Sequence, residues 1–292
     1  MFIICSKKDN LGSHPDWQSL HNHFELGWEV AATHIDAKYL FATKAITPQN
    51  DVIVSLSGRE FLYSKLMPVM SYEEFARQRK ITDASRVKEL PDVNDLTHVY
   101  ACTSWINTDI YHGGPEKRYK YEALVKDLYG VMDTPPVDHL AADPFYLCCW
   151  RYRNNHSTGR NTPPDTAAAI HAHLLKQTKF VYVVGLGAEP LCDGQRVIHI
   201  DLPTFAALAS HANCKAVVGA MTGTMQLGAI LCKTCVGVYQ HNDKVPEANE
   251  VNHPVVFGEC VNFNRNKRCL FYQPRTPVNE FLAHLDSMTG AA

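Results

Sequence analysis

Apolar runs alternate along the first part of the chain with more polar segments. We expect strands from the apolar runs at residues 2–5, 28–34, 51–56 and 99–103. A helix is predicted to begin after Ser71, because a serine followed three residues later by a glutamate, here Glu74, forms a capping box. This part of the chain therefore has the strand and helix signals of an α/β protein.

The second part of the chain repeats this alternation with longer and more apolar elements. Strands are predicted in the segments PFYLCC, FVYVV, RVIHI, KAVVGA, CVGVYQ and KRCLFYQ. Helices are predicted in DTAAAIHAHLLKQT, PTFAALASHA, TGTMQLGAIL and residues 278–288, where apolar residues recur at helical spacing. Strands that alternate with helices indicate parallel sheets with crossover helices, so both halves are predicted to be α/β units.

A change of composition separates the two halves. The segment MDTPPVDHLAADP, residues 132–144, contains adjacent prolines and three aspartates and has little periodicity, which is typical of a domain boundary. A chain of 292 residues is also long for a single core. We expect an N-terminal domain over residues 1–135, a second over 136–277, and a C-terminal helix over 278–292.

Composition and charge narrow the classes of partner and compartment. The formal net charge of −2 gives no overall field that would attract nucleic acid or a membrane surface. The N-terminal apolar run is too short for a signal peptide, and the chain has no run of about 18 apolar residues. We therefore expect a soluble protein of the cytoplasm, or of the host cytoplasm if the protein is viral.

The ten cysteines are scattered, which fits a reducing compartment better than a disulfide framework. Cys232 and Cys235 form a C-x-x-C motif, but no second pair follows at the spacing of a zinc ribbon. We expect these thiols to be structural and the protein to hold no metal.

The segment KAVVGAMTGTMQLGAIL, residues 215–231, is the clearest candidate for binding chemistry. It is predicted to be a strand, a tight turn and a helix that starts near Thr222, Gly223, Thr224 and Met225. The first N–H groups of a helix lack intrahelical acceptors and point outward with the positive end of the helix dipole, where they can bind a phosphate. A threonine cap is also common in any α/β protein, so the motif by itself leaves an ordinary helix start open.

Residues 145–240 resemble the donor-binding domain of GT-B glycosyltransferases, most nearly the heptosyltransferase-like and fucosyltransferase-like branches. Those domains carry a (Ser/Thr)-Gly-x-x-(His/Gln)-x-(Ala/Gly) helix start where this chain has Thr222-Gly223-Thr224-Met225-Gln226-Leu227-Gly228. The first half resembles a GT-B acceptor domain in strand order and loop placement. The resemblance implies a GT-B fold, in which two Rossmann-like parallel-sheet domains face each other across a cleft.

The resemblance also implies an activity: a hexosyl- or pentosyltransferase moves a sugar from a nucleotide-sugar donor to a hydroxyl of a sugar or glycan acceptor. We expect inversion, no metal, and no cofactor beyond the UDP- or GDP-linked donor. The leaving diphosphate would be bound by the Thr222 turn and by arginines of the loop after the first strand of the second domain, namely Arg151, Arg153 and Arg160. The nucleoside would be bound by residues at the ends of the next two strands: Gly185, Gly187, Asp201 and Leu202.

The catalytic base is expected in the first domain. His14 follows the first strand, where plant-type glycosyltransferases place a catalytic histidine, and a histidine titrates near neutral pH. Asp36 is the second candidate.

Other activities remain open at this point. Basic clusters at residues 77–88 and 117–120 would suit a phage-type DNA glycosyltransferase that acts on a hydroxymethylated base. Nucleotide-sugar epimerases share the architecture but act on the donor alone. A non-catalytic nucleotide- or glycan-binding module is the third alternative.

Overall fold

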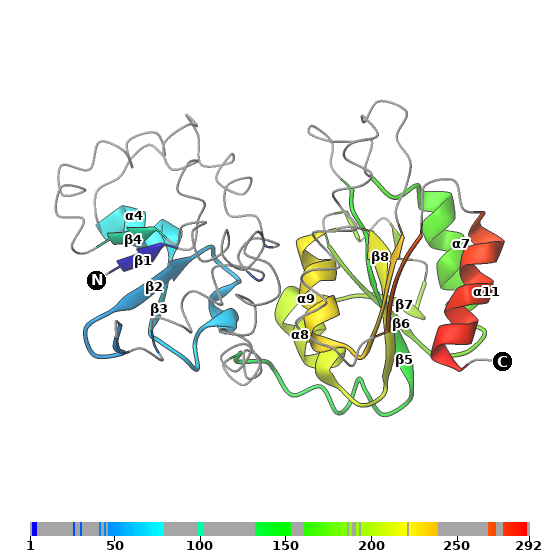
Figure 1. Cartoon of the computed structure of the whole chain (residues 1–292), viewed down its shortest axis with the longest axis horizontal. Helices are drawn as coiled ribbons and strands as arrows, with labels where there is room; N and C mark the ends of the chain where they lie inside the picture. Colours follow the sequence, from blue (N-terminus) through cyan, green and yellow to red (C-terminus); the bar gives the residue numbers. More distant parts are fainter. Residues whose placement is uncertain are drawn as a thin grey trace, which may run out of the picture. The chain divides into compact units, whose positions relative to one another are not determined.

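The computed structural model describes the chain in two compact units, residues 1–133 and 134–292 (Figure 1). The described residues are 2–4, 26, 30, 41, 44, 46–78, 99–101, 132–152, 161–185, 187, 188, 191, 192, 194–220, 222–238, 268–272 and 277–290. Each unit is described by itself below.

Unit 1 contains a parallel sheet with the strand order β3-β2-β1-β4. The strands are β1 (Phe2–Ile4), β2 (Val52–Ser55), β3 (Val69–Ser71) and β4 (Val99–Ala101). Three of these confirm strands predicted from apolar runs. The strand predicted over residues 28–34 is wrong at Val30, the described residue of that run, which is helical. An apolar run of this length is compatible with a buried turn of helix as well as with a strand.

Among the described residues of unit 1, the helical elements with defined bounds are η3 (Glu60–Leu62) and α4 (Tyr72–Gln78). The backbone N–H of Glu74 donates to Ser71 Oγ at 3.1 Å. The predicted cap on α4 is therefore confirmed, since the serine hydroxyl satisfies an N–H group that has no intrahelical acceptor.

Unit 2 contains a wholly parallel sheet with the strand order β10-β9-β8-β5-β6-β7. Its strands match the predicted runs: β5 (Phe145–Cys149), β6 (Val181–Val184), β7 (Val197–His199), β8 (Cys214–Ala220), β9 (Thr234–Val238) and β10 (Arg268–Tyr272). Parallel sheets of this kind are covered on both faces, and their strands consequently read as continuous apolar runs.

The helices of unit 2 cover both faces of its sheet (Figure 1). Helices α8 (Leu202–Ser210) and α9 (Gly223–Leu231) lie side by side on one face, and α7 (Pro164–Leu174) and α11 (Val278–Thr289) lie together on the other. The result is a three-layer α/β/α sandwich. No helix among the described residues combines the length and the apolar character needed to cross a membrane.

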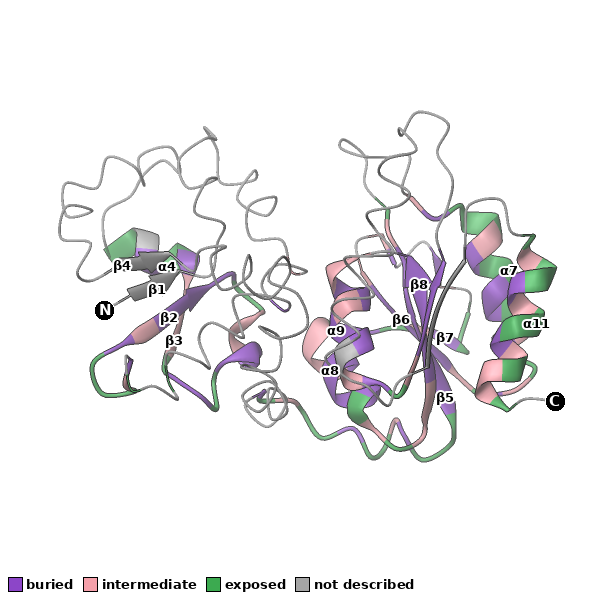
Figure 2. Cartoon of the chain, in the orientation of Figure 1, coloured by how far each residue is buried: buried purple, intermediate pink, exposed green. Residues whose placement is uncertain are grey.

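The core of unit 2 is centred on β5, whose five residues are all buried (Figure 2). Alternate side chains of this strand point to opposite faces. Tyr146 and Cys148 join the apolar cluster formed with Ile170 of α7 and Phe281 of α11. The sheet is thus fixed from both sides, and the loops at the ends of its strands have a rigid base.

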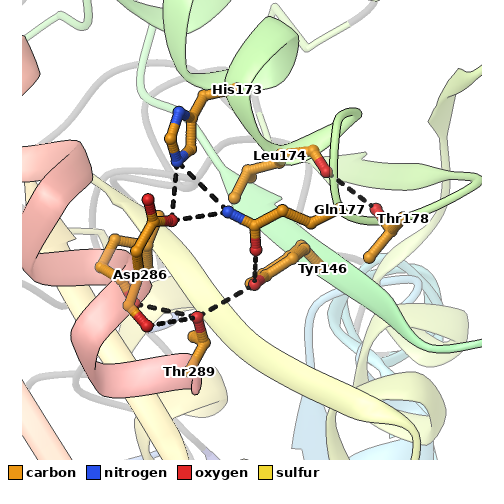
Figure 3. A network of polar contacts seen from close by, with 8 residues as sticks. Tyr146, His173, Leu174, Gln177, Thr178, Asp286 and Thr289 are labelled. Atoms are coloured by element: carbon orange, nitrogen blue, oxygen red, sulfur yellow. Dashed lines mark hydrogen bonds and ion pairs between the residues drawn. The ribbon is translucent and has the colours of Figure 1, made fainter. Parts of the chain in front are cut away.

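A polar network joins α11 to α7 and β5 (Figure 3). Tyr146 Oη donates to Gln177 Oε1 at 2.6 Å and lies 3.1 Å from Thr289 Oγ1. Gln177 Nε2 donates to Asp286 Oδ1 at 2.5 Å, and His173 Nε2 is 2.7 Å from the same oxygen. Both nitrogens therefore converge as donors on one carboxylate, which requires the proton on His173 Nε2.

Candidate functional site

The strand order of unit 2 creates a topological switch point between β5 and β8. From β5 the chain proceeds through β6 and β7 in one direction, and from β8 through β9 and β10 in the other. In open parallel sheets, ligands bind in the crevice outside the carboxyl ends of the strands at such a point. Cys149, the last residue of β5, is paired with Gly219 of β8. Arg151 and Thr222 therefore follow two adjacent strands at the switch point.

The loop that leaves β5 is held in place by two hydrogen bonds. Trp150 Nε1 donates to His171 Nε2 at 2.9 Å, and both side chains are buried between β5 and α7. The N–H of Thr162 donates to the carbonyl of Arg151 at 2.9 Å, which joins the two ends of the loop. The base of this loop is fixed, and Arg151 itself is half-buried there.

Gly185 and Gly187 follow β6 and allow its loop to approach the β5 loop closely. Gly185 has φ of +125°, and a Cβ there would lie 2.6 Å from the carbonyl oxygen of Trp150. Gly187 has φ of +68°, and a Cβ there would lie 2.9 Å from Cβ of Tyr152. Glycine is required at both positions by backbone conformation and by space. Gly185 and Gly187 were predicted to contact the nucleoside. In the structure they allow the β6 loop to pack against Trp150 and Tyr152 of the β5 loop.

Tyr152 is a candidate that the sequence did not indicate. Its ring lies over Gly187, yet 42% of the residue is exposed, an unusual state for an aromatic side chain at a strand end. An aromatic ring held from below and open above can stack on a planar ligand. The signal in the sequence is only an aromatic residue between two arginines, and its position beside Gly187 depends on the pairing of β5 with β6.

The turn that starts α9 has the predicted geometry. Thr222 is the N-cap, with an extended backbone, and its Oγ1 accepts from the N–H of Met225 at 3.1 Å. The N–H of Gln226 donates to the carbonyl of Thr222 at 3.1 Å. The N–H groups of Gly223 and Thr224 precede the first intrahelical hydrogen bond, so helix geometry leaves them directed outward.

A cluster of sulfur atoms supports this turn from the core side. Met225 is fully buried, and its Sδ lies 3.4 Å from Cys149 Sγ and 3.9 Å from Cys235 Sγ. Burial raises the pKa of the thiols of Cys148 and Cys149, so both are neutral and neither is suited to act as a nucleophile. Met225 was predicted to lie at the binding site. In the structure its backbone N–H is part of the turn, whereas its side chain packs in the core.

The helices that begin at this edge of the sheet differ in their charge. α7 starts with Pro163 and Pro164 and has Asp165 in its first turn, and α11 has Glu280 in its first turn. α8 is capped by Asp201. Among the described helices of unit 2, α9 is the one whose first turn and cap carry no carboxylate. Because a carboxylate at a helix N-terminus opposes a second anion, α9 is the best anion-binding helix end of the four.

Asp201 and Leu202 lie at a different place along the same edge. The carboxylate of Asp201 accepts from the N–H of Thr204 at 2.9 Å, and Leu202 is the first, half-buried residue of α8. Both follow β7, which is three strands from β8, a separation of about 14 Å at the usual strand spacing. The structure does not bring these two residues together with Thr222.

Four predicted site residues lie outside the described part of the chain: His14, Asp36, Arg153 and Arg160. The roles assigned to them stay predictions. Of the three arginines predicted to bind phosphate, Arg151 is the one that the structure describes.

No protein-family model and no curated protein matches the chain. Solved structures do. The chain is 13% identical to Escherichia coli heptosyltransferase WaaC with ADP over 98% of this chain and 99% of that one, with a TM-score of 0.54. It is 9% identical to a glycosyl transferase family 9 protein from Veillonella parvula DSM 2008, over 100% and 97% of the two chains, also with a TM-score of 0.54.

The same E. coli heptosyltransferase with ADP-2-deoxy-2-fluoro heptose matches at 12% identity over 98% of both chains, with a TM-score of 0.50. At such low identity these likenesses establish the fold alone. They extend over nearly the whole length of each chain. The chain thus shares the α/β fold of these glycosyltransferase structures.

Proposed function

We propose that this protein is a glycosyltransferase that moves a sugar from a nucleotide-sugar donor to a hydroxyl group of a sugar or glycan. The observation that carries the proposal is the start of α9, which lies at the switch point of the sheet. This helix is capped by a threonine and has no carboxylate in its cap or first turn, whereas each of the other described helices of unit 2 has a carboxylate there. A nucleotide sugar presents a diphosphate, the kind of anion that such a helix end binds.

The diphosphate would be bound from both sides of the switch point. The N–H groups of Gly223 and Thr224 would donate to phosphate oxygens from the β8 side. Arg151 would supply charge from the β5 side, since continuing the alternation of β5 past Cys149 and Trp150 directs it toward the α9 face. A guanidinium and a helix N-terminus stabilise the charge that develops on a leaving diphosphate, which is the main requirement of sugar transfer.

The nucleoside would extend from the diphosphate toward β6. Tyr152 presents an exposed ring on that side, supported by Gly187. Stacking on an aromatic ring stabilises a base by about 1–3 kcal/mol and accepts any base, because every base has a π-face. In this arrangement Gly185 and Gly187 shape the nucleoside site through Tyr152.

The remaining features of the reaction follow as part of the same proposal. His14 or Asp36 would act as the base on the acceptor hydroxyl, and the transfer would be inverting and independent of metal. UDP- and GDP-linked donors are proposed from the family resemblance. ADP-linked donors join them, because the heptosyltransferase structures that share this fold contain ADP and ADP-2-deoxy-2-fluoro heptose.

Nucleotide binding is the first test. The melting temperature of the full-length protein would be measured with ADP, UDP, GDP, CMP and inorganic pyrophosphate. We expect at least one nucleoside diphosphate to raise it, since a ligand present at 100 times its Kd stabilises by about 2.7 kcal/mol. If no diphosphate raises the melting temperature, the proposed function is wrong.

Calorimetric titration of Arg151→Ala with the nucleotide that binds would then test the position of the diphosphate. Loss of a charged hydrogen bond of about 1.5–3 kcal/mol predicts a Kd that is roughly 10- to 150-fold weaker. Lys179→Ala is a matched control, because it removes an exposed cation at the opposite, amino end of β6. Equal losses in both variants would show a general effect of charge and contradict the assignment.

A further inference from the structure

We infer that Cys214 and Cys232 are a site of reversible oxidation, where a small disulfide such as oxidised glutathione converts the two thiols into an intramolecular disulfide. Their Sγ atoms are 3.6 Å apart although the residues are 18 positions apart in the sequence. Cys214 begins β8 and Cys232 directly follows α9, so the fold itself brings them together. The inference does not depend on the proposed function.

The pairing differs from the one that the sequence motif suggests. In the C-x-x-C segment, Cys232 would be expected to react with Cys235. In the structure Cys235 is fully buried in β9, and its Sγ contacts Met225. Cys232 faces Cys214 instead.

The two cysteines differ in exposure, and this sets the order of the steps. Cys214 is half-buried as a residue, although its thiol lies beneath the surface, whereas Cys232 is only 2% exposed, so Cys214 is the one that a small opening of the structure exposes first. The Cys214 thiolate would attack one sulfur of oxidised glutathione, forming a mixed disulfide and releasing one glutathione thiolate. Cys232 would then lose its proton and attack the Cys214 sulfur, which releases the second glutathione. Two protein thiols are oxidised and one small disulfide is reduced to two thiols.

Little movement is needed for the second step. A disulfide has an S–S length of about 2.05 Å, so the two sulfurs must approach by roughly 1.5 Å. Rotation of side chains supplies most of such a shift. The cross-link would tie the start of β8 to the end of α9, and so would enclose the whole strand, turn and helix that carry Thr222. It lies at the end of this unit remote from that turn.

Tryptic mapping of the full-length protein after native oxidation with oxidised glutathione tests the inference directly. Cleavage after Arg196, Lys215, Lys233 and Lys244 places the three relevant cysteines in separate peptides, residues 197–215, 216–233 and 234–244. We expect peptides 197–215 and 216–233 to be joined under non-reducing conditions and to separate on reduction. Without the joined pair, or with 216–233 joined to 234–244, the inference is wrong.

Single substitutions separate the roles of the two thiols. Cys232→Ser should leave Cys214 with glutathione attached, because the second thiol is missing. Cys214→Ser should leave Cys232 unmodified, because Cys232 is buried. Cys235→Ser is the matched control and should still form the cross-link. Modification of Cys232 in the Cys214→Ser protein, with an unchanged near-ultraviolet circular dichroism spectrum, would overturn the assigned order.

The melting temperature gives a second readout on the folded protein. Closing a loop of this length is expected to stabilise by restricting the unfolded chain, which corresponds to a rise of about 6–12 °C for a unit of this size. A fall in melting temperature after oxidation would mean that the two cysteines are poorly placed for a disulfide and would contradict the inference.

Discussion

Replacing Thr222 by valine tests the proposed diphosphate site at the residue that shapes it. Valine has nearly the same volume and the same branching at Cβ, so it keeps the extended backbone of the cap. It removes Oγ1, the atom that accepts from the N–H of Met225 at 3.1 Å. The substitution therefore removes this cap bond and the hydrogen bond between the Thr222 hydroxyl and the Cys149 thiol, and it changes little else.

Two magnitudes follow from the loss of the cap bond. The N–H of Met225 loses its acceptor, and loss of a threonine N-cap costs about 1 kcal/mol of stability, within a range of roughly 0.5–2. The first turn of α9 is then less ordered, and the N–H groups of Gly223 and Thr224 are no longer held in place for a ligand. We expect diphosphate binding to weaken by about 1–2 kcal/mol, which is roughly 5- to 30-fold in Kd.

Urea unfolding and calorimetric titration with pyrophosphate and with the nucleotide that binds would measure the two effects. Thr222→Ser keeps the hydroxyl and should restore both. Ser71→Ala removes the corresponding cap of α4 in unit 1 and should cost similar stability without any change in Kd. If Thr222→Val shows the loss of stability but binds pyrophosphate as tightly as the wild type, the phosphate does not bind at α9 and the reasoning is refuted.

Three further predictions concern other parts of unit 2. Gly187→Ala places a Cβ 2.9 Å from Cβ of Tyr152, so it should displace the Tyr152 ring. In calorimetric titrations, binding of the nucleoside diphosphate should weaken at least several-fold while binding of pyrophosphate stays unchanged. Equal effects on both ligands would contradict stacking of the base on Tyr152. A double-mutant cycle with His173→Ala and Asp286→Ala, measured by urea unfolding, should give a coupling free energy of about 0.5–1 kcal/mol, because the pair is only partly shielded from solvent. If the losses of unfolding free energy in the two single variants add strictly in the double variant, the contact contributes nothing to stability. Burial and the neighbouring Cys232 raise the pKa of the Cys214 thiol, so the thiolate form stays a minority through pH 9. The rate of cross-linking should therefore rise about tenfold per pH unit between pH 7 and pH 9. A plateau of the rate in that interval would contradict the raised pKa.

The elements of unit 2 could be predicted because its strands are buried on both faces and its helices have visible starts. β5 and β6 are fully buried and read as unbroken apolar runs. The predicted cap at Thr222 accepts a hydrogen bond from the first turn of α9; Asp201, which was predicted to contact the nucleoside, caps α8 in the same way, and both are side-chain types that favour a helix start. Local chemistry was sufficient here because it agrees with the fold.

What the sequence did not contain is the order of the strands. Proximity of Tyr152 to Gly187 depends on β5 pairing with β6, and proximity of Cys214 to Cys232 depends on how α9 returns along β8. Neither contact has a periodic signal, since the residues are far apart in the chain. The strand predicted around Val30 was wrong for a related reason. An apolar composition indicates that a segment is buried, but burial does not distinguish a strand from a turn of helix.

The residues that follow β5 explain why this unit should not bind a dinucleotide in the usual way, although its strand order would suit one. Its order corresponds to that of dinucleotide-binding domains, in which a glycine-rich turn after the first strand lets the pyrophosphate reach the backbone and the next helix N-terminus. Here that turn begins with Trp150, Arg151 and Tyr152, and α7 begins with two prolines followed by an aspartate.

Bulky side chains block the close approach, proline removes N–H groups, and the aspartate repels an anion. The other side of the switch point has the opposite properties. At α9 the start has glycine, two threonines and no acidic residue, and Arg151 follows the neighbouring strand. The most favourable site for a diphosphate is therefore the start of α9 and not the start of α7. From there the nucleoside can extend toward β6, and the opposite end of the diphosphate is left for a transferable sugar.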